Sequence, residues 1–269
     1  MTTHSPYSKN RFSGQEALVE ETRLQEQAAV RWPQESALMR SVGLKEGSVI
    51  IDFGCGPGFI TELLATEVGK DGKVIGVEKN KKLFDIAKIR NANHTNVSII
   101  HSDVTHISEL ESACADFIYA RFILQHTPNH KHIMEEARRL LKPGGRLLVL
   151  DVDDALFHIT PYPDYISEFL NEAAQGQTSY GGDRYIGHKI AGFMHEAGYS
   201  EISPTVFTFT SKKISSDTFL DITTKFKIEL LNESRRTWGH SIINKLYEEA
   251  TSGSFFGTAG IYFVCGTKL

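Results

Sequence analysis

The 269-residue sequence has 41% hydrophobic and 23% charged residues, which are ordinary values for a globular protein with a substantial core. Its formal net charge is −4. Since a protein that binds a polyanion needs many Lys or Arg on one face, we expect no nucleic-acid partner. The three cysteines form no C-x-x-C pair, so the sequence supports neither a zinc site nor a disulfide framework, and no metal is expected.

No apolar stretch approaches the roughly 18 residues that a membrane-spanning helix needs, and the first residues lack the apolar core of a signal peptide. We therefore expect a cytoplasmic protein without a membrane partner. Residues 1–14 are predicted as an arm. Residues 15–42 carry apolar residues at helical spacing with a break at Pro33, which predicts two amphipathic helices, either over a ligand cleft or only at a sheet edge.

Residues 48–155 alternate between strand and helix patterns. Continuous apolar runs separated by helices are typical of a parallel sheet covered on both faces, so the expected fold is doubly wound α/β. The predicted strands are 48–53, 73–77, 97–101, 115–120 and 146–152, and the predicted helices are 59–68, 80–92, 107–111 and 129–141.

The alternation stops after Asp151. Residues 154–185 are rich in aromatic residues, which favours a substrate cap over the alternative of an ordinary surface excursion. The later predictions are helix 186–197, strand 206–210, helical stretches 215–235 and 238–251, and strand 260–265. The expected division is an N-terminal arm with lid helices (1–44), a Rossmann-like core (45–155), a cap insertion (156–185) and a C-terminal part with a helical insertion between the last two strands (186–269).

One stretch of the core carries a ligand-binding pattern. A buried strand ends in Asp52, and glycines follow at 54, 56 and 58 before a helix begins at Phe59. Glycine permits a sharp turn and lets a ligand approach main-chain N–H groups. The next strand ends in Glu78, 26 positions after Asp52, where an acid can accept both hydroxyl groups of a ribose.

These residues resemble the class I S-adenosylmethionine-dependent methyltransferases. The family's first motif, an apolar strand, an acid and a G-x-G-x-G loop, here reads Asp52-Phe53-Gly54-Cys55-Gly56-Pro57-Gly58. The resemblance covers about residues 45–155 and continues through Glu78, Ser102–Val104, Ala115–Ala120 and Leu140–Val149. It implies a seven-stranded, mostly parallel sheet, whose last two strands are antiparallel, and S-adenosyl-L-methionine as the cofactor.

The resemblance also implies how the cofactor would be held. The loop Gly54-Cys55-Gly56, with Gly58 completing the turn, would pass beneath the methionine part. Asp52 would receive the ammonium group, directly or through a water, and Glu78 would accept the ribose hydroxyls. The alternative is that the two acids only face solvent at the ends of their strands.

The remaining cofactor contacts follow from later motifs of the same family. Asp103 would lie near the adenine amino group, with Val104 offering a backbone N–H. Arg121 would either neutralise the cofactor carboxylate or pair with an acid on the lid. The other residues expected at the cofactor are Lys79, beside Glu78, and the pair Arg23 and Gln27 on an N-terminal helix.

His126 is the candidate general base, because it follows the fourth strand at the carboxyl edge and an imidazole titrates near neutral pH. The alternative is a histidine that fixes its loop by hydrogen bonding. Catalysis would need little more, since alignment alone can lower a barrier by roughly 7–11 kcal/mol. The residues expected to line the acceptor pocket are Tyr7, Trp32, Phe157 and Tyr162.

The expected activity is methyl transfer to O, N or C of a small organic acceptor, such as a secondary or cofactor-type metabolite. One alternative is a nicotinamide-dependent oxidoreductase on a related sheet, and another is a non-catalytic module that only binds the cofactor. Dinucleotide binders prefer G-x-G-x-x-G, whose third glycine falls where this sequence has Phe59. The sequence leaves the acceptor and the oligomeric state open.

Overall fold

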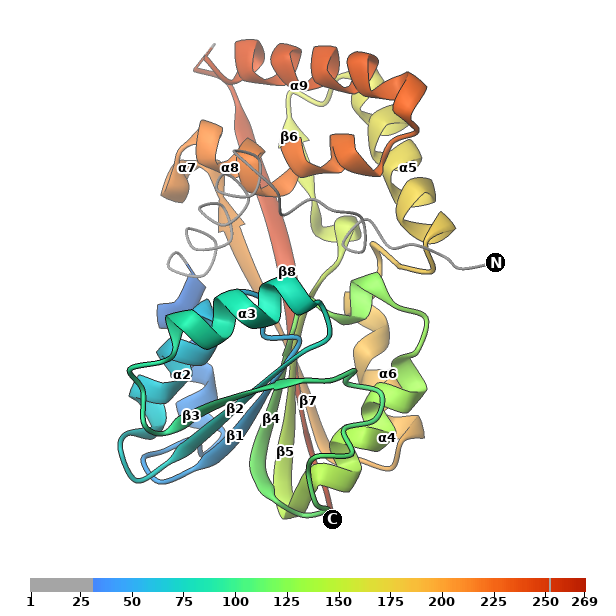
Figure 1. Cartoon of the computed structure of the whole chain (residues 1–269). Helices are drawn as coiled ribbons and strands as arrows, with labels where there is room; N and C mark the ends of the chain where they lie inside the picture. Colours follow the sequence, from blue (N-terminus) through green and yellow to red (C-terminus); the bar gives the residue numbers. More distant parts are fainter. Residues whose placement is uncertain (1–30, 252) are drawn as a thin grey trace.

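A computed structural model describes residues 31–251 and 253–269, which build a mixed sheet with helices on both faces (Figure 1). Five parallel strands form its centre. In order across the sheet they are β3 (Val97–His101), β2 (Lys73–Glu78), β1 (Val49–Phe53), β4 (Ala115–Arg121) and β5 (Leu141–Val152). The predicted doubly wound α/β fold is therefore confirmed.

Three further strands extend the sheet beyond β5. β8 (Phe256–Thr267) runs antiparallel to β5, and β7 (Ser200–Thr210) runs antiparallel to β8. The short β6 (His158–Thr160) pairs with the start of β8 and was not expected from the sequence. Three residues are too few to show strand periodicity, so only pairing with β8 makes this segment a strand.

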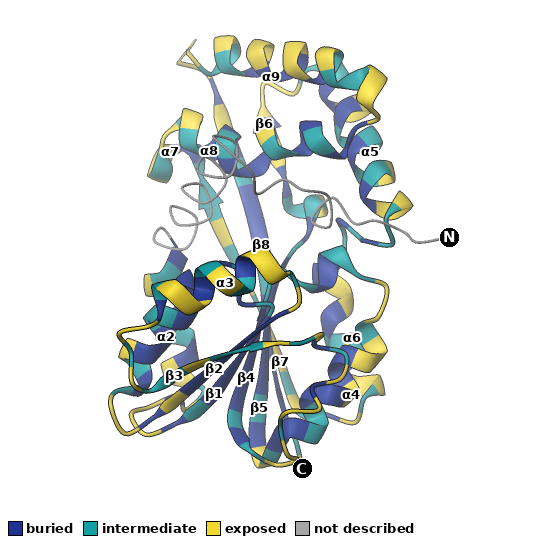
Figure 2. Ribbon diagram, in the orientation of Figure 1, coloured by how far each residue is buried: buried dark blue, intermediate teal, exposed yellow. Residues whose placement is uncertain are grey.

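Helices cover the two faces of the central sheet (Figures 1 and 2). Residues 31–41 and α2 (Phe59–Val68) pack on one face, and α4 (His130–Leu140) and α6 (Ile190–Glu196) pack on the other. The central strands are buried between these layers (Figure 2). α3 (Lys81–Arg90) lies beside α2, against β2 and β3.

The predicted helix at 107–111 is wrong. The segment forms turns, whose polar groups are satisfied by α4 instead of by a helix. The Ile107 N–H donates to Glu136, and Arg139 donates to the carbonyls of Ile107 and Leu110. The break expected at Pro33 is also not seen, since Pro33 lies within the helical residues 31–41.

A second group of helices surrounds the first part of β8, which extends beyond the central strands (Figure 1). They share an apolar cluster that contains Phe169, Phe219 and Phe255. The stretch expected as one helical region at 215–235 is divided into several short helices. The group comprises α5 (Asp164–Ser179), α7 (Ser211–Ile214), α8 (Ser216–Thr223), α9 (Arg236–Ala250) and the 3-10 helices η4 (Lys225–Leu230) and η5 (Glu233–Arg235).

The remaining 3-10 helices follow the carboxyl ends of strands or precede α6. They are η1 (Leu124–His126), η2 (Asp154–Leu156) and η3 (Gly187–Lys189). Within the described ranges, no helix has both the length and the apolar character needed to cross a membrane.

Candidate functional site

The glycine turn between β1 and α2 has a positive φ at each of its three glycines, a conformation that favours glycine. Gly58 has φ 84°, and a Cβ there would lie 2.5 Å from the Asn91 side chain and 3.1 Å from the Cα of Ala87. Gly56 has φ 55°, but no atom of residues 31–251 or 253–269 lies within 4 Å of the place that its Cβ would take. The turn is therefore packed at Gly58 and open at Gly56, which leaves room for a ligand beside the main chain.

Glu78 ends β2 next to this opening. Its Oε2 accepts the Gly56 N–H at 3.0 Å, and its Oε1 accepts the Asn80 N–H at 2.7 Å. Burial raises the pKa of Glu78, against the effect of these two bonds. A carboxylate has about four acceptor positions, so these two bonds leave acceptor capacity for a ribose hydroxyl. This geometry fits the predicted cofactor.

Asp52 lies on the other side of the turn, on β1. It is 2% exposed, and its Oδ2 accepts the Thr61 hydroxyl of α2 at 2.7 Å. Its Oδ1 has no hydrogen-bond partner among the residues described. Burial raises the pKa of Asp52 to about 7. A buried carboxylate with a free oxygen fits a cationic ligand group, such as the ammonium group of S-adenosylmethionine.

The third acid of this edge, Asp103, follows β3. Its Oδ1 accepts the N–H and the hydroxyl of Thr105, both at 2.9 Å, and Lys79 Nζ lies 3.7 Å from Oδ2. Partial burial alone would raise the pKa of Asp103, but the Thr105 hydrogen bonds and the Lys79 charge outweigh it, and the pKa is lowered. Val104 beside it is buried. The acids that end β1 and β2 and the one that follows β3 are thus at one edge of the sheet.

Arg121 pairs with an acid that the sequence analysis did not single out. Glu35, on helix 31–41, accepts from Arg121 Nε at 3.0 Å and Nη2 at 3.1 Å, and from the Tyr119 hydroxyl at 2.8 Å. The carboxylate is 1% exposed. Of the two roles left open for Arg121, the structure has the ion pair. The available signal was an acid at helical spacing between Trp32 and Met39, on an apolar helix face.

His126 lies in η1 after β4. Gln177 of α5 donates its amide to the Gln125 carbonyl at 2.6 Å, and the same Nε2 lies 3.0 Å from His126 Nδ1. Because an amide nitrogen can only donate, Nδ1 accepts this bond, and the neutral ring then carries its proton on Nε2. In this state Nδ1 is occupied by the Gln177 amide and Nε2 carries a proton, so the ring can donate a hydrogen bond but has no free nitrogen to act as a base.

A second buried charge cluster lies just after the end of β5. Asp154 accepts from Arg184 at 2.8 and 3.1 Å and lies 3.1 Å from Lys227 of η4. Burial alone would raise the pKa of Asp154, but the charges of Arg184 and Lys227 outweigh this effect and lower the pKa to about 2. Arg184 also donates to Gln125, so the cluster is joined to the loop that holds His126. Only the fold brings these distant residues together.

The expected acceptor residues are dispersed. Phe157 is buried and stacks on Phe219 at 6.0 Å in the apolar cluster of the second helix group, and Trp32 packs against the sheet. Tyr162 is exposed. Tyr7, Arg23 and Gln27 lie outside the described residues.

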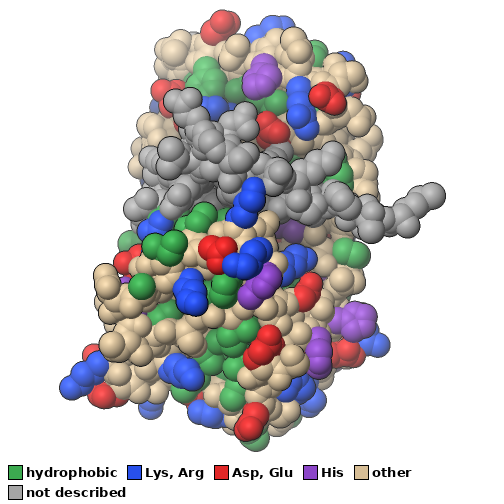
Figure 3. Space-filling view, viewed as in Figure 1, with side chains coloured by type: hydrophobic (Ala, Val, Ile, Leu, Met, Phe, Trp, Pro, Cys, Tyr) green, Lys and Arg blue, Asp and Glu red, His purple; other side chains and the backbone are tan. Residues whose placement is uncertain are grey.

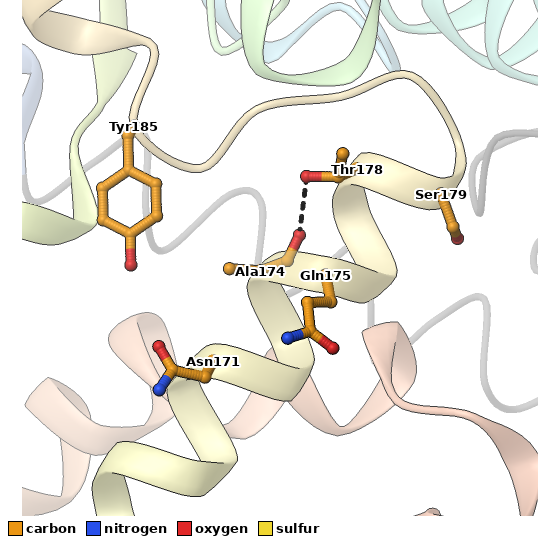
Figure 4. Close-up of a pocket in the computed structure, with 6 residues that line it drawn as sticks. All are labelled: Asn171, Ala174, Gln175, Thr178, Ser179 and Tyr185. Carbon is orange, nitrogen blue, oxygen red and sulfur yellow. Dashed lines mark hydrogen bonds between the residues drawn. The ribbon is translucent and has the colours of Figure 1, made fainter.

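A hollow of about 450 Å³ lies between α5 and the segment that follows it. In Figure 4, the Tyr185 ring points toward the helix face that carries Asn171 and Gln175. Thr178 also lines the hollow, and it is the chain neighbour of Gln177, which contacts His126. The lining side chains among the described residues are neutral. In the described part of the chain, no three potential metal ligands converge.

Comparison with known proteins gives a consistent result. The profile of a family described as a methyltransferase domain matches residues 44–214. An uncharacterised 37.1 kDa protein of a Streptomyces fradiae transposon is 31% identical over 66% of this chain and 50% of its own. Demethylmenaquinone methyltransferase of Staphylococcus aureus is 29% identical over 42% of this chain and 47% of its own. The matches thus span about half the length of these curated relatives.

Among solved structures, phosphoethanolamine N-methyltransferase 2 of Haemonchus contortus, bound to phosphomonomethylethanolamine and S-adenosylhomocysteine, superposes with a TM-score of 0.63. The superposition covers 100% of this chain and 60% of that chain, at 16% sequence identity. At that identity, the likeness concerns the fold.

Proposed function

This chain belongs to the class I S-adenosylmethionine-dependent methyltransferase family, and from this premise we propose that it methylates O, N or C of a small organic acceptor. The observation that carries the proposal is the pair of buried carboxylates, Asp52 and Glu78, on either side of a glycine turn that is open at Gly56. When bound, S-adenosylmethionine supplies a methyl group activated by a sulfonium.

Each part of the site has a proposed role. Glu78 accepts the ribose hydroxyls, Asp52 receives the ammonium group, and the main chain at Gly56 lies beneath the methionine part. Asp103 and Val104 face the adenine, with Lys79 beside Asp103. The protein's contribution to the reaction is then mainly to align an acceptor atom behind the methyl group and to exclude water.

Two features support a small acceptor. The open hollow of about 450 Å³ beside α5 has room for a small molecule. On the face seen in Figure 3, Lys and Arg side chains are mixed with Asp and Glu, without an extended basic area among the described residues. Such a mixed surface favours a small metabolite over a nucleic acid.

The direct test combines binding with turnover. Calorimetry should show that the purified protein binds S-adenosylmethionine, and incubation with metabolite extracts should convert the cofactor to S-adenosylhomocysteine. Binding without conversion in any extract would favour the non-catalytic module, and binding of a nicotinamide cofactor instead would favour the oxidoreductase.

We also propose that His126 holds its loop in place and does not act as the general base, because Gln177 occupies Nδ1. In His126→Asn, the new side-chain oxygen can accept the same bond, so turnover should stay above about a third of the wild-type value. A general base would contribute roughly 10²–10⁴-fold. A loss of that size in His126→Asn, together with a lost limb of the pH–rate profile near neutrality, would restore the catalytic assignment.

Cofactor affinity should depend on pH through Asp52, whose pKa is raised to about 7. Only the ionised carboxylate attracts an ammonium group. Below this pKa a proton must leave before the ammonium group binds, so the dissociation constant should rise by up to about tenfold for each unit of pH. Calorimetry from about pH 7 down to 5 checks this, and a constant affinity over the range would contradict the Asp52 role.

A further inference from the structure

Asp52, Tyr119 and Arg121 project from one face of the sheet. Asp52 on β1 is the direct register partner of Tyr119 on β4, and Arg121 is two residues further along, on the same side of its strand. Helix 31–41 covers this face, and its Glu35 accepts hydrogen bonds from Tyr119 and Arg121. The result is a buried layer of ionisable groups directly beneath the glycine turn.

The charges in this layer are arranged unevenly. Arg121 forms an ion pair with Glu35, at 3.0 Å, but it forms no ion pair with Asp52 at a nitrogen–oxygen distance of 4 Å or less. Both side chains of the pair are buried, at 9% and 1% exposure, so the guanidinium charge is offset locally and little screened by water. Asp52 is the register partner of Tyr119 and a further carboxylate on this face of the sheet, and its charge interacts with that of Arg121.

We propose that Glu35 is a positioning residue for cofactor binding, because it holds the Arg121 guanidinium away from Asp52 and leaves that carboxylate to the cofactor's ammonium group. This inference rests on the proposed function. It assigns the helix before β1 an electrostatic task in the cofactor site, in addition to covering the sheet. Arg121 is then a charge that must be neutralised, and not a ligand of the cofactor carboxylate.

The groups that face Asp52 come from five elements. They are Thr61 on α2, Cys55 in the glycine turn, Glu78 on β2, Tyr119 and Arg121 on β4, and Glu35 on helix 31–41. Among the charges, Arg121 lowers the pKa of Asp52, whereas Glu78 and Glu35 raise it. Removing the Glu35 charge should therefore make Asp52 more acidic while it weakens the binding of a cation.

The test is a double-mutant cycle measured by calorimetry with S-adenosylmethionine at about pH 7. Glu35→Gln should bind the cofactor at least about tenfold more weakly, because Arg121 is left to compete for Asp52. The double variant Glu35→Gln with Arg121→Met should return to within about threefold of the wild type, since the competing cation is gone. Tyr119→Phe, which removes one bond to Glu35 but no charge, is the matched control and should bind like the wild type.

A second readout needs no cofactor. In the cofactor-free protein, the carboxyl carbon of Asp52, followed by NMR, should titrate at a lower pH in Glu35→Gln than in the wild type. A merely structural role for Glu35 would lower the melting temperature without this shift and without rescue by the second substitution. If Glu35→Gln does not fold, the double variant still tests the proposal. If Arg121 normally bound the cofactor carboxylate, the double variant, which lacks Arg121, would bind the cofactor weakly.

Two results would overturn the inference. One is unchanged affinity in Glu35→Gln, and the other is a double variant that binds as weakly as Glu35→Gln alone. A wild-type protein that fails to bind S-adenosylmethionine would instead count against the proposed function, and the Asp52 titration would then decide on Glu35 by itself.

Discussion

Gly56→Val should abolish S-adenosylmethionine binding, with a loss of affinity above about a hundredfold, in a protein that still folds. The valine side chain would enter the space beside the Cβ position, which no atom of the described residues approaches within 4 Å. That space lies beside the N–H that Glu78 accepts. A hundredfold loss corresponds to about 2.7 kcal/mol, which overlap of a branched side chain with a bound ligand readily exceeds.

The chain offers a matched control for this substitution. Gly144 also has a positive φ, 79°, and no described atom within 4 Å of its Cβ position, but it lies at the opposite edge of the sheet, between the β5 residues Leu141 and Arg146 that pair with β4. Both valine variants should lose about 1–2 kcal/mol of stability from the left-handed backbone. Only Gly56→Val should lose binding. Equal losses of affinity in the two variants would show that backbone strain, and not the ligand space, is responsible.

Glu78→Ala is expected to have the second-largest effect, an affinity loss of at least tenfold. Two hydrogen bonds to a charged acceptor are worth roughly 1.5–3 kcal/mol each before water compensates for part of them. The substitution also leaves the N–H groups of Gly56 and Asn80 without their acceptor, so the glycine turn itself should loosen.

Calorimetry on Glu78→Ala and on Glu67→Ala separates these effects. Glu67 is an acid on α2 that pairs with Arg40 at the surface, and its removal should leave affinity unchanged. Glu78→Gln keeps one acceptor oxygen, so its affinity should lie between those of the wild type and Glu78→Ala. Wild-type affinity in Glu78→Ala would remove the ribose assignment.

The cofactor edge was predictable because its signals are local. The run from Val49 to Phe59 contains the strand, the acid, the turn and the helix start in one stretch, and β2 repeats the pattern with Glu78. Continuous apolar strands separated by helices are typical of a parallel sheet that is buried on both faces and covered by helices. The roles given to Asp52, Glu78 and Asp103 remain proposals, but their place at one sheet edge followed from strand order.

Other features depended on contacts that have no sequence period. The segment at 107–111 has apolar residues at helical spacing, yet Glu136 and Arg139 take its backbone groups and no helix forms. β6 is a strand only because the start of β8 passes beside it. In each case a side chain or strand far away in the sequence satisfies the main chain, and this outweighs a weak local preference.

The sequence by itself determined the class of fold, the family and the position of the acids around the glycine turn. Only the tertiary structure decided which charges meet. Glu35 and Arg121 are 86 positions apart, and Asp154 and Lys227 come from two different 3-10 helices, η2 and η4. The physical reason is that a buried charge must be paired. The partner is set by which helix covers which face, and this cannot be read from either residue's neighbours in the chain.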